Sequence, residues 1–352
     1  MRKLLAFLLV FILVTAAFGN NSEFEKIVES YKTEKNFNGV VLVATDGKID
    51  FISGVGQADR QLKTAISSKS KFKILSITKT FTAVLILKLY EQGKLDLNAT
   101  IGKYFPEYEG VGKDKVTIHQ LLTYSSGIAH ESDRGGMLPY KSSLTLDEMI
   151  KKYCSGKLEF EPGSKSVYAN TEYIILGKII EKVTGKSFEK VLQKEILSPL
   201  KMKDTGMANS QKSVKGLVPS YMQNETNKAL EPDEPYLIET FFASGAMYST
   251  AEDLLKFDTA IFSKKLLQPK TTDLMLKFYP ELDYTAYSIW GSDGYGAFKE
   301  KFYYRTGGIL GSIANWIHTI QSKKTIIVLS NTNTTNLLEL SEKLYLASIG
   351  KK

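Results

Sequence analysis

Cysteine and histidine are scarce in this sequence, and their scarcity excludes several kinds of site. Cys154 is the only cysteine, so neither an intramolecular disulfide nor a paired-cysteine metal site can form, and we interpret Cys154 as a structural thiol. The three histidines, His119, His130 and His318, form no His-Glu-x-x-His motif, and Gly-x-Ser-x-Gly is absent. We therefore expect no metal site and no histidine-based serine triad. His130 lies in a polar segment and is interpreted as a solvated residue, with a position that lines the site as the alternative.

The sequence also lacks a long apolar run after its first residues, so no later segment is expected to span a membrane. At the start, Arg2 and Lys3 precede an apolar run from Leu4 to Phe18. A basic start followed by such a run is typical of a secretory signal. We predict a signal peptide at residues 1–19, with an uncleaved anchor as the alternative. The protein is expected to be exported, periplasmic or secreted, without stable membrane insertion after cleavage.

Basic residues outnumber acidic ones, but the excess is not concentrated in one place. The chain has 46 Lys and Arg against 38 Asp and Glu, a formal net charge of +8 at pH 7. Because the lysines are scattered, the pattern indicates a solvated surface and not a nucleic-acid groove. The expected partner is a small-molecule or peptide substrate, with no nucleic acid, and the sequence leaves the oligomeric state open.

Hydrophobic periodicity and turn residues predict an α+β fold. The strongest local signal is a hairpin over Gly39–Gly56 with an Asp-Gly turn. Helices are expected at 21–34, 77–91, 116–123, 145–153, 171–184, 187–195, 250–262 and 337–349, and further strands at 298–307, 312–320 and 324–331. Residues 128–144 are predicted to be a polar surface loop. We expect one domain over residues 20–352, with a sheet built from both chain ends, flanked by helices and interrupted by a mostly helical insertion at roughly 95–240.

A serine and a lysine stand at the start of a strongly apolar helix. The pattern Ser-x-x-Lys occurs six times in this lysine-rich chain, but only Ser76 and Lys79 are followed by a long apolar stretch. One interpretation makes Ser76 a helix N-cap and lets Lys79 extend to solvent. The other makes Ser76 a nucleophile at the helix N-terminus, with burial lowering the pKa of Lys79 so that it can take the serine proton.

Tyr168-Ala169-Asn170 is the only Tyr-x-Asn sequence in the chain, and it precedes another predicted helix. In an extended loop the side chains of Tyr168 and Asn170 point to one side. A phenol near a lysine can relay a proton, and an amide can hydrogen-bond a substrate. A turn residue followed by a helix cap is the alternative interpretation.

Arg305-Thr306-Gly307-Gly308 lies at the end of a predicted strand. Its glycines let a substrate lie against the strand, and a backbone N–H there can donate to an oxyanion. Gly307 and Gly308 would equally serve a hairpin turn, which is the alternative interpretation.

The three motifs follow one another in the order Ser-x-x-Lys, Tyr-x-Asn and cation-Thr-Gly. Together with His119–Ile128, Pro162–Gly185 and Ser244–Phe257, they give a chain that resembles the serine β-lactamase and penicillin-binding-protein superfamily, in the branch of class C β-lactamases, D-alanyl-D-alanine carboxypeptidases and related esterases. The resemblance covers nearly the entire mature chain. It implies the β-lactamase/DD-peptidase fold, with a mainly antiparallel sheet, and a reaction that needs no metal or organic cofactor.

The resemblance also implies a catalytic role for three matched residues. Ser76 would be the nucleophile that forms an acyl-enzyme, and Lys79 would be the base for acylation. Tyr168 would pass a proton to the leaving group and later help to activate water.

Four further positions would bind the substrate. The resemblance implies that Asn170 holds the substrate's amide, that the nucleophile and Gly308 donate backbone N–H groups to the oxyanion, and that Thr306 belongs to the same binding set. Arg305 stands where the family more often has lysine or histidine. An arginine cannot shuttle a proton, but its planar fork can bind a substrate carboxylate and lower the pKa of Tyr168.

The implied function is a serine hydrolase that cleaves an amide, β-lactam or ester bond. A cell-wall-type D-amino-acid peptide or a β-lactam-like compound is the expected substrate. Two alternatives stay open: a non-catalytic penicillin-binding-like protein that captures wall peptides or a partner, and a short-chain carboxylesterase.

Overall fold

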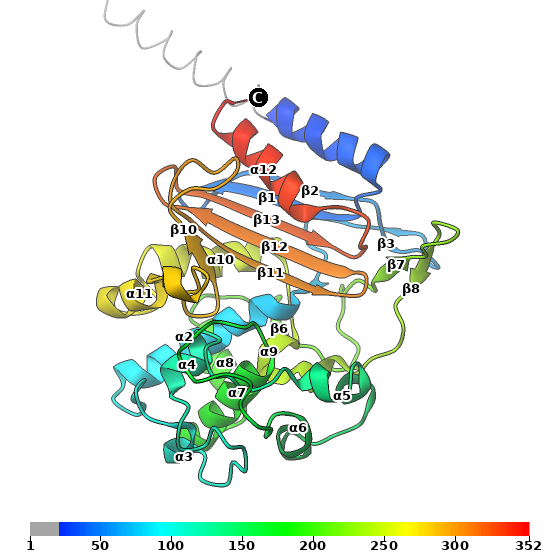
Figure 1. The fold of residues 1–352 in the computed structure, drawn as a ribbon. Helices are drawn as coiled ribbons and strands as arrows, with labels where there is room; N and C mark the ends of the chain where they lie inside the picture. Colours follow the sequence, from blue (N-terminus) through cyan, green and yellow to red (C-terminus); the bar gives the residue numbers. More distant parts are fainter. Residues whose placement is uncertain (1–20, 352) are drawn as a thin grey trace, which may run out of the picture.

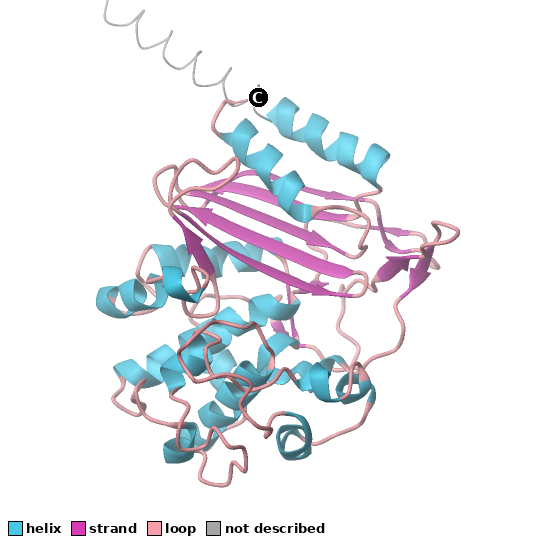
Figure 2. Ribbon diagram, in the orientation of Figure 1, coloured by secondary structure: helices cyan, strands magenta, loops and turns pink. Residues whose placement is uncertain are grey.

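A six-stranded antiparallel sheet, built from both ends of the chain, is the centre of the fold (Figures 1 and 2). In the computed structural model, which describes residues 21–351, the strand order is β10-β11-β12-β13-β1-β2. The strands are β1 (Gly39–Thr45), β2 (Lys48–Val55), β10 (Trp290–Ser292), β11 (Phe302–Ile309), β12 (Ser312–Thr319) and β13 (Lys324–Ser330). The predicted α+β class and the sheet from both chain ends are confirmed. The predicted signal peptide at residues 1–19 lies outside the described residues.

Two helices cover one face of this sheet. The helix over residues 21–35 and α12 (Leu337–Ser348) lie side by side there (Figure 1). In β1, Val41 and Val43 pack into the core under these helices, and the residues that alternate with them pack into the larger core on the opposite face. A strand buried on both faces has an unbroken apolar sequence, as this one does.

The opposite face of the sheet packs on α10 (Ala251–Phe262) and, beyond it, a helical region with α2 (Thr78–Glu91) inside. Nearly every residue of α2 is buried, as its almost wholly apolar sequence predicts. The remaining helices are α3 (Ile101–Tyr104), α4 (Ile118–Leu122), α5 (Leu138–Lys141), α6 (Leu146–Tyr153), α7 (Thr171–Thr184), α8 (Phe188–Leu192), α9 (Phe242–Gly245) and α11 (Pro269–Leu276), with the short turns η1 (Leu75–Ile77), η2 (Glu131–Arg134), η3 (Gln193–Leu197), η4 (Ile238–Phe241) and η5 (Pro280–Leu282).

Three small sheets complete the described structure. They consist of β5 (Phe72–Lys73), β9 (Met247–Ser249) and β6 (Gly206–Met207); of β3 (Gln57–Asp59) and β4 (Thr64–Ala65); and of β7 (Tyr221–Gln223) and β8 (Leu230–Pro232). The first of them leads the chain into η1 and α2. Among residues 21–351, no helix has the length and apolar character needed to cross a bilayer.

Most predicted elements are confirmed to within a few residues. Helix α7 begins and ends where the sequence predicted. Its end could be predicted because Gly185 follows it with a φ of +66°, a conformation that favours glycine and ends a helix. The predicted hairpin is present as β1 and β2. The short elements α3, α9, β6 and β10 were not predicted, because two to four residues carry too little periodicity.

The prediction of a polar surface loop at 128–144 is wrong. This segment contains η2 and α5, and both Glu131 and Tyr140 are buried. The Tyr140 ring stacks on Phe241 with 3.8 Å between ring centroids, and the Tyr140 carbonyl accepts a hydrogen bond from the Leu237 N–H at 2.7 Å. A segment far along the chain therefore covers what the local sequence presents as a solvated loop.

Candidate active site

Ser76 lies in the turn that joins β5 to α2. The N-cap residue of α2 is Ile77, which makes no side-chain cap bond, and the side chain of Lys79 is fully buried. The interpretation of Ser76 as an N-cap with Lys79 extended to solvent is therefore wrong. Leu75 has a φ of +49°, which is uncommon for a residue with a side chain of this size. Strained backbone of this kind is concentrated at functional sites.

Strand β11 runs directly against this turn. A Cβ atom on Gly307 would lie 2.4 Å from the Ile74 carbonyl oxygen and 3.0 Å from the Ser76 nitrogen, so only glycine allows this approach. Thr306 and Gly308 alternate with it and are exposed. These two predicted substrate-binding positions are therefore accessible from solvent.

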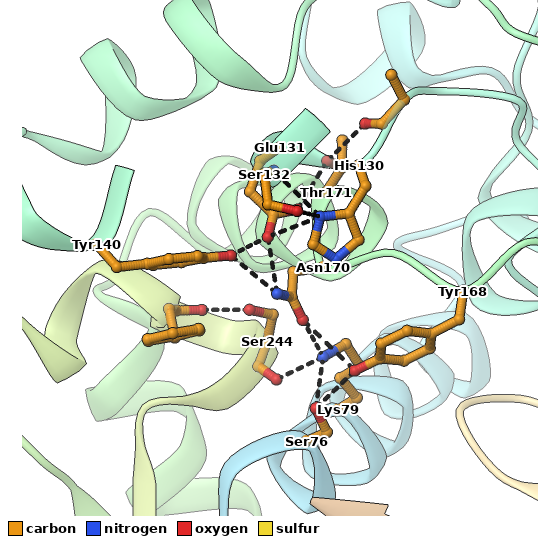
Figure 3. Close-up of polar contacts among 12 residues, drawn as sticks. Ser76, Lys79, His130, Glu131, Ser132, Tyr140, Tyr168, Asn170, Thr171 and Ser244 are labelled. Carbon is orange, nitrogen blue, oxygen red and sulfur yellow. Dashed lines mark hydrogen bonds and ion pairs between the residues drawn. The ribbon is translucent and has the colours of Figure 1, made fainter. Parts of the chain in front are cut away.

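The side chains of Ser76, Lys79, Tyr168 and Asn170 converge (Figure 3). The Ser76 Oγ lies 2.6 Å from the Tyr168 hydroxyl. The Lys79 ammonium donates to the Ser76 Oγ at 3.2 Å, to the Asn170 Oδ1 at 2.6 Å and to the Ser244 carbonyl at 2.8 Å. All three ammonium protons are thereby accounted for, which explains how α2 accommodates a buried lysine.

The pKa values of the lysine and the phenol are both shifted. Burial lowers the pKa of Lys79 to about 8, because the charged form loses its hydration, and the charge of Arg305 acts in the same direction. Burial alone would raise the pKa of Tyr168, but the positive charges of Lys79 and Arg305 outweigh it and lower that pKa to about 8. The two groups therefore bind a proton with similar affinity, which suits proton transfer between them and Ser76.

Asn170 is held from both ends of its amide. Its Oδ1 accepts from Lys79, and its Nδ2 donates to Glu131 Oε1 at 2.8 Å and to the Tyr140 hydroxyl at 2.9 Å. Only 9% of the residue is exposed. This geometry does not support the predicted grip on a substrate amide, because the Nδ2 donors are already used inside the protein. Asn170 instead orients the lysine that contacts Ser76.

Arg305 is also more enclosed than its predicted role requires. Its exposed fraction is 1%, its Nε donates to the Ser76 carbonyl oxygen at 2.9 Å, and its Nη2 donates to the Tyr168 hydroxyl at 3.3 Å. The guanidinium lies over the rings of Tyr124, Tyr168 and Trp290, 5.0 to 5.9 Å from their centroids. This position fits the predicted effect on the pKa of Tyr168. It does not fit the predicted bidentate binding of a substrate carboxylate.

Sequence reasoning missed Glu131 and Tyr140 and misplaced His130. Glu131 is fully buried beside Asn170. The side chain of His130, interpreted as solvated, is 24% exposed, and its Nδ1 accepts from the Ser132 backbone N–H at 3.1 Å. The one available signal was that Tyr140 is the only tyrosine in its polar segment.

The structure offers no arrangement for a metal ion within the described residues. Among residues 21–351, no group of three or more His, Cys, Asp or Glu side chains could hold one.

Comparison with known proteins identifies the family. The model of the family described as Beta-lactamase matches residues 24–351. This chain belongs to the β-lactamase family. The resemblance inferred from the three motifs, and the fold it implied, are thereby confirmed.

Individual relatives are more distant. The chain is 28% identical over 264 residues to a teichoic acid D-alanine hydrolase of Staphylococcus aureus, a match that covers 73% of this chain and 63% of that protein. The chain thus spans less than two thirds of the length of this curated relative. An octameric penicillin-binding protein homologue from Pyrococcus abyssi has a TM-score of 0.80 and 25% identity, over 94% of this chain and 78% of that one.

A D-amino acid amidase from Ochrobactrum anthropi SV3 has the same fold. Its TM-score is 0.81 over 94% of this chain and 99% of the amidase chain, with 21% sequence identity. At this identity the likeness shows the fold alone.

Proposed function

We propose that this protein is a serine hydrolase that works through an acyl-enzyme on Ser76. The observation that carries the proposal is the position of the Ser76 Oγ, which lies within hydrogen-bond distance of both the Tyr168 hydroxyl and the Lys79 ammonium. A nucleophile next to a base that is itself oriented by a third group is the arrangement that covalent catalysis by serine requires. Here the base is Lys79 and the third group is Asn170.

The reaction follows from these contacts. Neutral Lys79 takes the Ser76 proton, directly or through Tyr168, while Oγ attacks the substrate carbonyl. The backbone N–H groups of Ser76 and Gly308 donate to the oxyanion, an effect worth about 3 kcal/mol per donor in comparable sites. Tyr168 returns the proton to the leaving group as the acyl-enzyme forms. Water, activated by the same pair, then releases the acid and restores the serine hydroxyl.

For the substrate, we infer an ester or amide of a D-amino acid, with D-alanine as the first acyl group to test. This rests on the relative named a teichoic acid D-alanine hydrolase. D-alanyl peptides and β-lactams remain within the same reaction class, since all of them acylate the serine. We further propose that the protein is exported and acts on a small-molecule or peptide substrate, not on a nucleic acid.

One panel of substrates tests the proposal. Purified protein and Ser76→Ala are each given a D-alanyl ester, a D-amino-acid amide, a D-Ala-D-Ala peptide, a chromogenic cephalosporin and a short-chain nitrophenyl ester. We expect turnover of the D-alanyl ester by wild type and none by Ser76→Ala. A protein that turns over none of the five and labels with neither a fluorescent phosphonate nor a labelled penicillin is a non-catalytic binder, and the proposal is then wrong.

A further inference from the structure

Glu131 is a fully buried acidic residue that belongs to none of the three motifs. Its Oε1 accepts hydrogen bonds from the Tyr140 hydroxyl and, at 2.8 Å, from the Asn170 Nδ2, and its Oε2 accepts from the Thr171 hydroxyl at 3.2 Å (Figure 3). The His130 Nδ1 lies 3.3 Å from Oε1. An apolar side chain of similar volume would be easier to bury than a carboxylate, so its place here calls for a reason other than packing.

The contacts of Glu131 decide which way the Asn170 amide points. With Nδ2 toward Glu131 and Tyr140, Oδ1 faces the Lys79 ammonium at 2.6 Å. The reverse orientation would set Oδ1 against the carboxylate oxygen and the NH₂ group against the ammonium, so both contacts would be repulsive. The carboxylate therefore selects the amide orientation in which Lys79 has an acceptor.

The Lys79 ammonium donates hydrogen bonds to three neutral oxygens, those of Ser76, Asn170 and Ser244, and lies over the rings of Tyr168 and Tyr173. The titratable and charged groups that face it come from four parts of the structure: Tyr168, just before α7; Glu172 and Tyr173, on α7; Glu131, on η2; and Arg305, on β11. Burial raises the pKa of Glu172 to about 8, with a smaller contribution from Glu131, so Glu172 is uncharged at neutral pH. Glu131 lies one amide group away from Lys79 and favours the protonated lysine.

We propose that Glu131 is a positioning residue for Lys79: its carboxylate fixes the orientation of the Asn170 amide, and its charge, one amide away, supports the protonated lysine. The chain of contacts runs from Glu131 to Asn170 and from Asn170 to Lys79, and ends at the Ser76 hydroxyl (Figure 3). This inference rests on the proposed function, because it concerns the base that activates Ser76. Burial of Lys79 has the largest effect on its pKa, and the charge of Glu131 acts against it, so that charge shifts the pH at which the site becomes active.

The test is the pH dependence of Ser76 labelling in Glu131→Gln, a substitution that keeps the side-chain volume and removes the side-chain charge. Second-order labelling of Ser76 by a fluorescent phosphonate is measured from pH 5.5 to 9.5. We expect the plateau rate to fall roughly 10- to 100-fold, because the lysine is less well held. The midpoint of the acidic limb should move to lower pH by roughly 0.5 to 1 unit, because the neighbouring negative charge is gone.

Asp133→Asn is the matched control. It removes one carboxylate from the same segment, but Asp133 is exposed. Its plateau and midpoint should equal those of wild type. A purely structural role for Glu131 would lower the plateau of Glu131→Gln and leave its midpoint in place, and that result would overturn the proposal.

Two further variants keep the test decisive. Glu131→Asp retains the carboxylate but moves it away from the Asn170 Nδ2. The plateau labelling rate of this variant should fall, and the midpoint of its acidic limb should lie between those of wild type and Glu131→Gln. In an Asn170→Ala background, Glu131→Gln should change the plateau by less than about twofold, since the connecting amide is already absent.

Two remaining outcomes distinguish failure of this inference from failure of the proposed function. If neither Glu131→Gln nor Glu131→Asp folds, as judged by circular dichroism, the residue is structural and the proposal is overturned. If wild-type labelling does not depend on Ser76 at all, the proposed function itself is wrong, and this inference falls with it.

Discussion

Gly307 lies so close to the backbone of Ser76 that no other residue fits there. A Cβ atom at this position would be 3.0 Å from the Ser76 nitrogen and 2.4 Å from the Ile74 carbonyl oxygen. Backbone atoms cannot yield as the end of a flexible side chain can, so strand β11 or the turn that carries Ser76 must move if a methyl group is added.

We therefore expect Gly307→Ala to lower the free energy of unfolding by about 2 kcal/mol. Gly308→Ala is the matched control, because the nearest atom to its Cβ would be the Ser312 carbonyl oxygen at 4.0 Å. That variant should unfold at the same urea concentration as wild type. Equal stability of the two variants would show that β11 is not in close contact with the turn that carries Ser76.

The pKa values of Lys79 and Tyr168 predict an alkaline activity profile. Because burial lowers the pKa of Lys79 to about 8, the amine is protonated below that pH and cannot take the serine proton. We expect kcat/KM for a short-chain nitrophenyl ester to rise with pH toward about pH 8 and to fall at higher pH, because Tyr168, whose pKa is also about 8, then loses the proton that it passes to the leaving group. The Ser76→Ala rate is subtracted at each pH. A midpoint well below pH 8 would show that Lys79 is not the group whose deprotonation limits the rate.

Glu172 predicts a pH dependence of stability. It is 1% exposed, its Oε1 accepts from the Ser126 hydroxyl at 2.8 Å, and its Oε2 has no hydrogen-bond partner among the described residues. Burial raises its pKa to about 8. The unfolded chain loses this proton near pH 4.3, so the contribution of Glu172 to stability is complete below that pH and is lost as the pH rises toward 8.

We therefore expect Glu172→Gln to be more stable than wild type at pH 8, by an amount on the order of 4 kcal/mol, and to lose that advantage near pH 4. Urea unfolding at pH 4, 6 and 8 measures the difference. Glu109→Gln, which removes an exposed carboxylate, should follow wild type at every pH. A constant difference between Glu172→Gln and wild type would mean that Glu172 is ionised in the folded protein.

The burial of Arg305 predicts the absence of a carboxylate preference. Since the residue is 1% exposed and its Nε and Nη2 donate inside the protein, substrates with a free carboxylate beside the scissile bond should react no faster than their amide-blocked forms. The comparison uses kcat/KM for matched pairs of such substrates. A preference of more than about tenfold for the carboxylate would show that the guanidinium turns toward the substrate.

The proximity of Ser76 and Lys79 could be predicted from the sequence because the relevant signal is local. Ser76 and Lys79 are separated by three residues at the start of one apolar helix, so their proximity follows from helix geometry. Tyr168 and Asn170 are likewise two residues apart at the start of α7. The convergence of these pairs depended on the family resemblance, because no local pattern links residue 79 to residue 170.

The functions of Asn170 and Arg305 were harder to predict than their positions. Sequence indicates that an amide and a guanidinium are present, but not which of their donors are already used. Glu131 was missed for a related reason. Its burial depends on the contact between Tyr140 and Phe241, which joins two segments that are distant in the chain. In isolation, the segment around Glu131 has the composition of a solvated loop.

The pairing of β1 with β13 joins residues from Gly39↔Ser330 to Thr45↔Lys324. A nascent chain emerging from the ribosome cannot form these ladders until almost its last residues have been synthesised, and contacts between such distant positions form slowly. The sheet thus closes only when the chain is nearly complete. Such a delay is compatible with the export proposed above.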